Sequence, residues 1–487
     1  MLDVLDFVTD RGGDLKKIKE SQRRRYADEA LVDEVAELWQ DAYRTRYRAD
    51  QKRAEIGKVQ KEIGQLKKNK QDATELLEKK SQLESEAKQI AEEAVEKEKL
   101  RDKKCKSIGN YVHESVPINN NEDFNEVIQT WAPEGVTVEK TDCLSHHEVM
   151  TRAELYDGER GAKLVGHRGY FLRKWGVLLN QALINYGLHF LVERGYDPIQ
   201  PPYFMNKEYM GKTAQLEQFD EELYKVTEGP DTDDKYLIAT SEQPLSAMYA
   251  DEWMNAQDLP QKFAGYSTCF RKEAGSHGRD AWGLYRIHQF EKIEQFLFTK
   301  PEESWQALED MKETAEAFYQ SLKIPYRVVV IVSGALNNAA AKKYDLEAWF
   351  PFQGEYKELV SCSNCTDYQT RELEIRYGQK KGAVDSRKTY AHALNGTLCA
   401  TERTLCCLLE NYQKEDGFEV PEVLRKFIPG SPDFIPYTKE LPKESTSSKK
   451  KEGPKAKEKG GAPAGSGSKE AQPNAASVAD GMKNMKV

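Results

Sequence analysis

Four short segments of the chain combine arginine, glutamate, serine and threonine side chains at spacings that could bind an anionic substrate. A guanidinium group can grip a phosphate or a carboxylate through two parallel hydrogen bonds, and a carboxylate can hold Mg²⁺. Such side chains are mostly exposed or ion-paired, so the meaning of each segment depends on the elements that position it. The segments are 239–243, 270–273 with its continuation 286–294, 356–361 and 394–403.

The second segment predicts a β-hairpin with charged side chains at both ends. A first strand ends at Arg271 and Glu273, a glycine-rich loop follows over 275–283, and a return strand runs from Arg286 to Glu294. This order of strand, loop and strand brings an arginine and carboxylates to one hairpin.

A surrounding region, 166–437, holds most of the aromatic residues and mixes short β-rich runs with helical ones. Helices and strands that do not alternate strictly are typical of an α+β domain, so we expect an antiparallel sheet flanked by helices. Glu402 and Arg403 open one of the predicted helices. Predicted helices cover 171–192, 303–322 and 404–409, and predicted strands cover 235–239, 262–270 and 326–332.

The N-terminal region predicts an antiparallel helical hairpin of coiled-coil type. Residues 1–30 form a small helical element with a turn at Gly12 and Gly13, and two apolar stripes of helical spacing follow over 31–66 and 73–94. A few polar residues separate the stripes, so the helices should fold back on each other. The tip at 52–70 holds seven Lys or Arg against two acids, which suggests contact with a polyanion and leaves a partner-binding arm and a solvated structural coiled coil as two open alternatives.

Length and composition limit the class of protein. At 487 residues the chain suggests two to four domains, and its net charge of −9 argues against a general nucleic-acid coat. There is no run of 18 apolar residues, no signal-peptide pattern and only 8 scattered cysteines, so we expect a cytoplasmic protein with reduced thiols and no membrane contact. The expected domains are 1–112 (arm), 113–165 (connector), 166–440 (catalytic) and 441–487 (Lys-rich disordered tail).

Three ordered signatures resemble those of the class II aminoacyl-tRNA synthetases. The helix leading to Pro202 is similar to the first signature, the hairpin from Arg271 to Phe290 to the second, and Glu402-Arg403 at a helix start to the third. Alanine and threonine stand at 400 and 401, where the third signature is usually glycine-rich, and the seryl branch of the class tolerates this.

The finer resemblance, over roughly residues 1–440, is to the seryl-tRNA synthetases in their cytosolic eukaryotic form. Thr240-Ser241-Glu242 is similar to that family's serine-binding segment, and the stretches 213–224 and 359–369 and the helical arm are similar too. The resemblance implies that serine and ATP form seryl-adenylate with release of pyrophosphate. The seryl group then moves to the 3′-terminal adenosine of tRNA(Ser).

The resemblance also implies a role for each site residue. Arg271 binds the α-phosphate and the serine carboxylate, Arg403 binds the γ-phosphate, and Glu358 with Ser361 holds Mg²⁺. A pocket that hydrogen-bonds the serine hydroxyl would reject alanine. The implied serine-binding residues are Thr240, Ser241, Glu242, Arg271, Glu294 and Asn395. The implied ATP-binding residues are Arg271, Lys272, Glu273, Ile287, His288, Gln289, Phe290 (stacked on adenine), Glu358, Leu359, Val360, Ser361 and Arg403.

By the same resemblance, the arm grips the long variable arm of serine tRNAs, and the enzyme is a homodimer. Recognition by shape through a basic coiled coil suits A-form RNA, which is read through its backbone and grooves. Whether tRNA(Sec) is also a substrate stays open. Candidate tRNA contacts are Lys52, Arg53, Lys58, Lys61, Lys67, Lys68 and Lys70.

Other interpretations remain beside this one. Cys362 and Cys365 form a lone CxxC without a second pair, so no zinc is expected. The pair His146-His147 suits a surface or capping feature better than a metal site. The Lys-rich tail could bind RNA or a protein, act as a nuclear signal, or simply be solvated. Rival functions are a non-catalytic RNA-binding or regulatory protein on a synthetase scaffold, and a structural coiled-coil scaffold.

Overall fold

The computed structural model describes residues 1–213, 219–227, 229, 234–273, 283–378 and 388–441. Three sequence features fall wholly or partly outside these ranges: the glycine-rich loop over 275–283, part of the stretch 213–224, and the tail predicted to be disordered. No helix in the described ranges is both long and apolar enough to span a bilayer.

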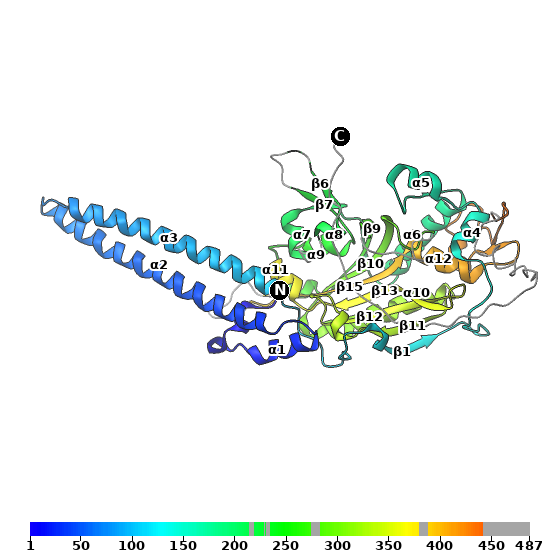
Figure 1. Cartoon of the computed structure of the whole chain (residues 1–487), viewed down its shortest axis with the longest axis horizontal. Coiled ribbons are helices and arrows are strands. Elements are labelled where there is room, and N and C mark those ends of the chain that lie inside the picture. The colour runs from blue at the N-terminus through cyan, green and yellow to red at the C-terminus, as the bar shows by residue number, and fades with distance from the viewer. Residues whose placement is uncertain (214–218, 228, 230–233, 274–282, 379–387, 442–487) are drawn as a thin grey trace, which may run out of the picture. The chain divides into compact units, whose positions relative to one another are not determined.

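The N-terminal region forms the predicted antiparallel helix pair, in which α2 (Ala30–Lys68) and α3 (Thr74–Lys106) run side by side (Figure 1). Near the tip, Val59 and Ile63 of α2 pack with Leu83 of α3 in one apolar cluster. The apolar stripes therefore predicted the arm correctly, because a helix buries the residues that recur every three or four positions.

A small helical element precedes the arm, as the sequence predicts. It consists of the 3-10 helices η1 (Val4–Phe7) and η2 (Thr9–Arg11) and of α1 (Leu15–Arg24). Gly12 adopts a left-handed φ of 85°, and a Cβ on Gly13 would lie 2.4 Å from the carbonyl oxygen of Asp6. Both positions of the predicted turn therefore need glycine.

One buried arginine joins the base of the arm to the rest of the chain. The Arg25 guanidinium donates to the carbonyl oxygens of Asn110 (2.9 Å), Asn337 (3.1 Å) and Ala340 (2.5 Å). Burial lowers the pKa of Arg25 to about 10, so it remains charged at neutral pH. It also donates to the carbonyl oxygen of Leu336 (3.3 Å), so four carbonyl dipoles solvate a buried cation in place of water.

The centre of the fold is an eight-stranded sheet in the order β1-β11-β12-β13-β15-β10-β9-β4. All its pairs are antiparallel except β4 with β9, which confirms the predicted α+β class. The edge strand β1 comes from the segment that the sequence had placed in a connector. The strands are β1 (Glu126–Trp131), β4 (Asp197–Ile199), β9 (Gln261–Phe270), β10 (Gln289–Thr299), β11 (Tyr326–Val330), β12 (Lys342–Phe350), β13 (Glu355–Asn364) and β15 (His392–Ala400).

Helices α6 (Trp175–Val192), α10 (Ser304–Ser321) and α12 (Thr401–Tyr412) pack on the sheet through the largest apolar core. Short elements complete the fold. The helices are α4 (His146–Arg152), α5 (Gly158–Val165), α7 (Lys207–Thr213), α8 (Phe219–Glu222), α9 (Glu242–Ala247), α11 (Tyr368–Glu372) and α13 (Glu422–Arg425). The strands are β2 (Tyr156–Asp157), β3 (Phe171–Leu172), β5 (Phe204–Asn206), β6 (Lys225–Val226), β7 (Lys235–Leu237), β8 (Trp253–Met254), β14 (Arg376–Tyr377), β16 (Gly417–Glu419) and β17 (Phe434–Pro436).

The two faces of the sheet differ in chemistry because successive side chains on a strand point to opposite sides. On β15, Leu394 and Leu398 enter the core that the helices cover, whereas Asn395 and Thr397 line a cavity on the other face. On β10, Ile293 enters the core and Glu294 lines the cavity. The helices thus fill one face and leave the other as the floor of a polar site.

Candidate active site

The cavity on this polar face has a volume of about 240 Å³ and is built from the segments that the sequence singled out. The hairpin β9–β10 supplies one wall, β13 and β15 the floor, the start of α12 another wall, and the segment 240–242 one end. Twelve of the expected substrate-binding residues line it: Thr240, Glu242, Arg271, Glu273, Ile287, Phe290, Glu294, Glu358, Leu359, Ser361, Asn395 and Arg403.

Two arginines in the cavity are held by backbone carbonyls. The Arg271 Nε donates to the carbonyl oxygen of Ala239 (3.4 Å), and the Arg403 Nε donates to that of Tyr285 (3.3 Å). Each guanidinium also lies over an aromatic ring, Arg271 over Phe290 at 5.3 Å and Arg403 over Tyr285 at 5.0 Å. Among the described residues neither forms an ion pair, so both cations are positioned to receive an anion.

Glu358 is the carboxylate that these cations surround. Enclosure by protein raises the pKa of its side chain, but Lys343, Arg403, Arg271 and Arg286 lower it more, and the net shift is downward. The carboxylate stays accessible through the cavity and is ionised at neutral pH. An ionised carboxylate beside arginines suits a metal ion that bridges phosphates.

A second carboxylate, Asp345, lies behind Ser361. The Ser361 hydroxyl donates to Asp345 Oδ1 (2.6 Å), and Lys343 Nζ lies 3.1 Å from Asp345 Oδ2. Burial raises the pKa of Asp345 to about 7. Asp345 therefore orients the hydroxyl that the sequence assigned to the metal site, a role that sequence reasoning missed.

The other end of the cavity holds two carboxylates and one lysine. Lys292 Nζ lies 2.5 Å from Glu294 Oε2 and donates to Thr240 Oγ1 (2.7 Å), while the Thr240 hydroxyl donates to the same Glu294 oxygen (2.7 Å). Glu242 Oε1 accepts from Asn395 Nδ2 at 3.0 Å. This end of the cavity therefore offers acceptor oxygens that suit a small ligand with an ammonium group and a hydroxyl.

Glu242 has an unusual protonation equilibrium. Burial, together with the nearby charge of Glu294, raises the pKa of its carboxyl group to about 7. Gln369 Nε2 donates to Glu242 Oε1 (2.9 Å), which opposes the shift without cancelling it. A bound ammonium group would favour the ionised form, so this carboxylate is suited to a cationic ligand.

Glu402, at the start of α12, supports the wall of the cavity that α12 forms. Its Oε2 accepts from the Glu291 backbone amide (3.0 Å) and from the Thr401 hydroxyl (2.9 Å), and Tyr170 donates to its Oε1 (3.3 Å). Burial and the charge of Glu291 raise the pKa of Glu402 well above its ordinary value. These contacts tie α12, and hence Arg403, to strand β10.

Five of the expected residues do not line the cavity. Val360 points into the apolar core, because it alternates with Ser361 on β13. Ser241 is fully buried with its hydroxyl 3.5 Å from Glu294 Oε2, and His288 Nδ1 bonds to the Arg271 carbonyl oxygen (3.0 Å). Lys272 and Gln289 lie beside the cavity residues of the hairpin without lining the cavity themselves.

Ten further residues of the wall were not among those that the sequence assigned to the substrate site. Lys292, Ser363 and Thr397 follow the two-residue alternation set by Glu294, Ser361 and Asn395, so strand periodicity could have found them. Asn337 and Lys343 come from a loop and a neighbouring strand, and only the tertiary structure brings them in. The ten are Leu284, Tyr285, Arg286, Lys292, Asn337, Lys343, Ser363, Thr397, Ala400 and Glu402.

Comparison with known proteins agrees with this geometry. Residues 1–112 match the seryl-tRNA synthetase N-terminal domain, and residues 224–412 match the tRNA synthetase class II core domain (G, H, P, S and T). The chain is 60% identical to the cytoplasmic serine–tRNA ligase of Schizosaccharomyces pombe, over 93% of this chain and 100% of that protein. It is 56% identical to the cytoplasmic enzyme of Saccharomyces cerevisiae, over 93% and 99%. The chain belongs to the seryl-tRNA synthetase family.

Solved structures of the seryl-tRNA synthetase family show the same fold. The cytoplasmic serine–tRNA ligase of Naegleria fowleri in complex with AMP has a TM-score of 0.78 and 48% identity, covering 90% of this chain and 99% of that one. The seryl-tRNA synthetase of Pyrococcus horikoshii complexed with ATP has a TM-score of 0.79 and 34% identity, covering 90% and 100%.

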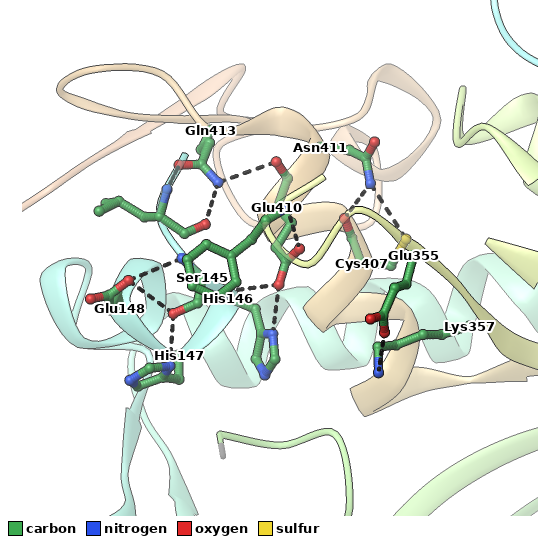
Figure 2. Close-up of polar contacts among 12 residues, drawn as sticks. Ser145, His146, His147, Glu148, Glu355, Lys357, Cys407, Glu410, Asn411 and Gln413 are labelled. Atoms are coloured by element: carbon green, nitrogen blue, oxygen red, sulfur yellow. Dashed lines mark hydrogen bonds and ion pairs between the residues drawn. The ribbon is translucent and has the colours of Figure 1, made fainter. Parts of the chain in front are cut away.

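Within this family fold the pair His146-His147 is structural, as Figure 2 shows. Ser145 and Glu148 form a capping box at the start of α4, and His147 Nδ1 lies 2.7 Å from the Ser145 hydroxyl. His146 is only 3% exposed and bonds through Nδ1 to Glu410 Oε1 of α12 (2.9 Å). The surface interpretation is therefore wrong for His146, which joins two buried elements.

In the described part of the chain, no group of three or more His, Cys, Asp or Glu side chains could hold a metal ion. Cys362 and Cys365 are both buried, and burial raises the pKa of each thiol above its ordinary range. The thiols therefore stay protonated and behave as small core residues.

The candidate RNA-binding residues of the arm fall into two groups. Lys52 lies 2.8 Å from Glu86 and Arg53 lies 3.0 Å from Asp50, so the arm itself partly neutralises both. Lys58, Lys61, Lys67, Lys68 and Lys70 are exposed, and none of them has an ion-pair partner among the described residues. The second group is the more available to an external anion.

Proposed function

We propose that this chain attaches L-serine to tRNA(Ser) through a seryl-adenylate, with ATP as the energy source. The observation that carries the proposal is the meeting, in one cavity, of two arginines and the ionised Glu358 with an end built from Glu242, Glu294, Thr240 and Lys292. The first set suits the phosphates of ATP, and the second suits the ammonium and hydroxyl of serine.

In the first step, a carboxylate oxygen of serine attacks the α-phosphorus of ATP. The bond from that phosphorus to the bridging oxygen breaks, and pyrophosphate leaves with the electron pair. We assign Arg271 to the serine carboxylate and the α-phosphate, and Arg403 to the γ-phosphate. Both arginines are already held by backbone carbonyls, so little ordering is required when the substrates bind.

Adenine and Mg²⁺ have fitting partners in the same cavity. Phe290 offers a ring for stacking, and Glu273 and Ile287 lie on the same hairpin. Glu358 and Ser361 would hold Mg²⁺, since Glu358 is kept ionised by its cationic neighbours and Asp345 orients the Ser361 hydroxyl. The ion would neutralise phosphate charge as pyrophosphate departs.

In the second step, a ribose hydroxyl of the terminal adenosine of tRNA attacks the seryl carbonyl carbon, and AMP leaves. We assign the arm, with its exposed lysines near the tip, to the RNA. The reaction would take place in the cytoplasm, since the relatives from Schizosaccharomyces pombe and Saccharomyces cerevisiae are named as cytoplasmic enzymes. We also propose a homodimer and the domain boundaries 1–112, 113–165, 166–440 and 441–487.

The test is amino-acid-dependent exchange of ATP with labelled pyrophosphate, in the presence of Mg²⁺ and without tRNA, for each standard amino acid. Exchange with serine alone is expected. No exchange with any amino acid, from folded protein that binds ATP, would contradict the proposal and favour a non-catalytic RNA-binding protein. Exchange with threonine or alanine as fast as with serine would contradict the serine pocket.

A further inference from the structure

An aromatic stripe with two exposed tyrosines runs along α2 at the base of the arm. Trp39, Tyr43 and Tyr47 recur every four residues and so share one face of the helix. The rings of Trp39 and Tyr43 are stacked, with centroids 5.2 Å apart and planes inclined by 6°. Tyr43 is 51% exposed and Tyr47 57% exposed. Exposing the apolar surface of these rings to water would be unfavourable in a helix pair that served only as a spacer.

Packing against α3 does not use this stripe. The residues of this part of α2 that are buried are Ala42, Thr45 and Ala49, which lie on a different face of the helix. Figure 1 shows the N-terminal helical element beside the base of α2, and its last 3-10 helix, η2, ends at Arg11. The aromatic stripe is therefore bordered by this element on one side and by solvent on the other.

Arginines surround the stripe. The Arg11 guanidinium lies 5.6 Å from the centre of the Trp39 ring and 5.9 Å from that of the Tyr43 ring. Arg44 and Arg48 are exposed on α2 next to the tyrosines. The acids of this stretch are mostly engaged: Asp41 lies 2.8 Å from Lys97 and Asp50 lies 3.0 Å from Arg53. The local surface thus combines aromatic faces with a positive charge.

We propose that this surface, which we call the root platform (Arg11, Trp39, Tyr43, Arg44, Tyr47 and Arg48), stacks unpaired bases of the RNA that the arm binds. Aromatic faces accept any base by stacking, and arginine adds phosphate contacts and cation–π attraction. Charge complementarity favours RNA over a protein partner, because RNA phosphates would pair with the exposed Arg44 and Arg48, which an apolar protein surface would not do. The inference rests on the proposed function, in which the arm binds tRNA.

The root platform differs from the lysines near the tip in both place and chemistry. Twenty residues of helix separate Tyr47 from Lys67, which corresponds to about 30 Å at 1.5 Å per residue. The lysines would bind phosphates through charge, whereas the platform would bind bases through stacking. One folded RNA would thus be held at two points of the arm, and loss of a platform ring would leave the salt dependence of binding unchanged, whereas loss of a tip lysine would reduce it.

The test is a titration of the full chain with tRNA(Ser) transcript at several salt concentrations. Tyr43→Ala and Tyr47→Ala should each weaken binding roughly tenfold while leaving the slope of log K against log salt unchanged, as expected for a lost stacking contact. Tyr43→Phe and Tyr47→Phe should bind like the unmodified chain, because the ring remains. Lys67→Ala should instead reduce the slope by about one.

Leu100→Ala is the matched control, because Leu100 is an apolar residue on α3 with similar exposure, 46%. Unchanged affinity for tRNA in both tyrosine-to-alanine variants would overturn the proposal that the root platform stacks bases. A change of salt slope equal to that of Lys67→Ala would overturn it too. A change of oligomeric state in these variants would also overturn it and indicate a protein contact. Serine-dependent pyrophosphate exchange needs no RNA, so its presence or absence judges the proposed function separately.

Discussion

At the scale of single residues, the chemistry of the site depends on which charged side chains are paired within the protein and which are not. Lys292 lies between Glu294 and Thr240, and the lysine's charge is neutralised within the protein. Glu242 has no cationic partner at ion-pair distance among the described residues, and its pKa rises to about 7 because of burial and of Glu294. The free protein therefore holds one carboxylate that a cationic ligand would stabilise.

Glu242→Gln should weaken serine binding while stabilising the fold. The KM for serine should rise far more than the KM for ATP, because only serine carries an ammonium group. At pH 8 the carboxyl is ionised in both folded and unfolded states, and its pKa shift from 4.5 to about 7 costs up to about 3 kcal/mol, which the amide removes. Exchange kinetics and urea unfolding would measure the two effects.

The raised pKa of Glu242 also predicts how the stability gain and the use of serine depend on pH. The stability gain of Glu242→Gln should be full above pH 7 and shrink as the pH falls, until it vanishes below pH 4.5, where the carboxyl is protonated in both states. In the unmodified chain, kcat/KM for serine should fall as the pH drops below about 7. Equal rises of KM for serine and ATP would refute the role given to Glu242.

At the scale of elements, α12 connects the cavity to the buried contact with α4. Its first turn carries Glu402 and Arg403, and two turns later Glu410 accepts from His146 in a contact that excludes water. Burial lowers the pKa of His146, but Cys406 and Glu410 raise it well above its ordinary value. The ion pair thus fixes the helix whose start presents Arg403 to the substrate.

His146→Ala should lower the free energy of unfolding by about 3 kcal/mol, because Glu410 would be left as a buried charge without its partner. His147→Ala is the matched control, since this neighbouring ring is half-buried and lies 2.7 Å from the hydroxyl of the capping residue Ser145. Its cost should stay below about 1 kcal/mol. Thermal and denaturant unfolding would compare the two, and equal losses would show that the His146–Glu410 pair is unimportant.

At the scale of the whole molecule, the base of the arm and the cavity meet at one loop. Arg25, just after α1, donates to the carbonyl oxygens of Leu336, Asn337 and Ala340, and the side chain of Asn337 lines the cavity. Asn337 Oδ1 in turn accepts from the backbone amide of Ala340 (2.9 Å). The arm and the substrate site therefore share a rigid joint.

Arg25→Met should destabilise the chain by at least about 3 kcal/mol, because several buried carbonyl groups would lose their donor. The KM for serine should rise as well, since Asn337 would lose its support. Lys17→Met is a suitable control, because it removes an exposed cation from α1, the helix that directly precedes Arg25. Unfolding and pyrophosphate exchange would measure both, and an unchanged KM in a folded Arg25→Met chain would show that the joint does not position the cavity.

The sequence by itself determined the helical arm, the β-hairpin, the helix opened by Glu402 and Arg403, and the α+β class. These elements depend on the periodicity of apolar residues and on the order of strand and turn residues along the chain, and both can be read from the sequence. The signatures around Arg271, Phe290 and Arg403 also indicate the family from the sequence alone.

Only the tertiary structure decided which side chains meet in the cavity. The sequence assigned Val360 to the ATP site, but strand alternation points its side chain into the core. The sequence assigned no site role to Lys292, Asn337 or Asp345. It also could not place His146, whose partner Glu410 is 264 residues away. Pairings between distant segments arise from how strands register and helices pack, and no local pattern of residues encodes that partner.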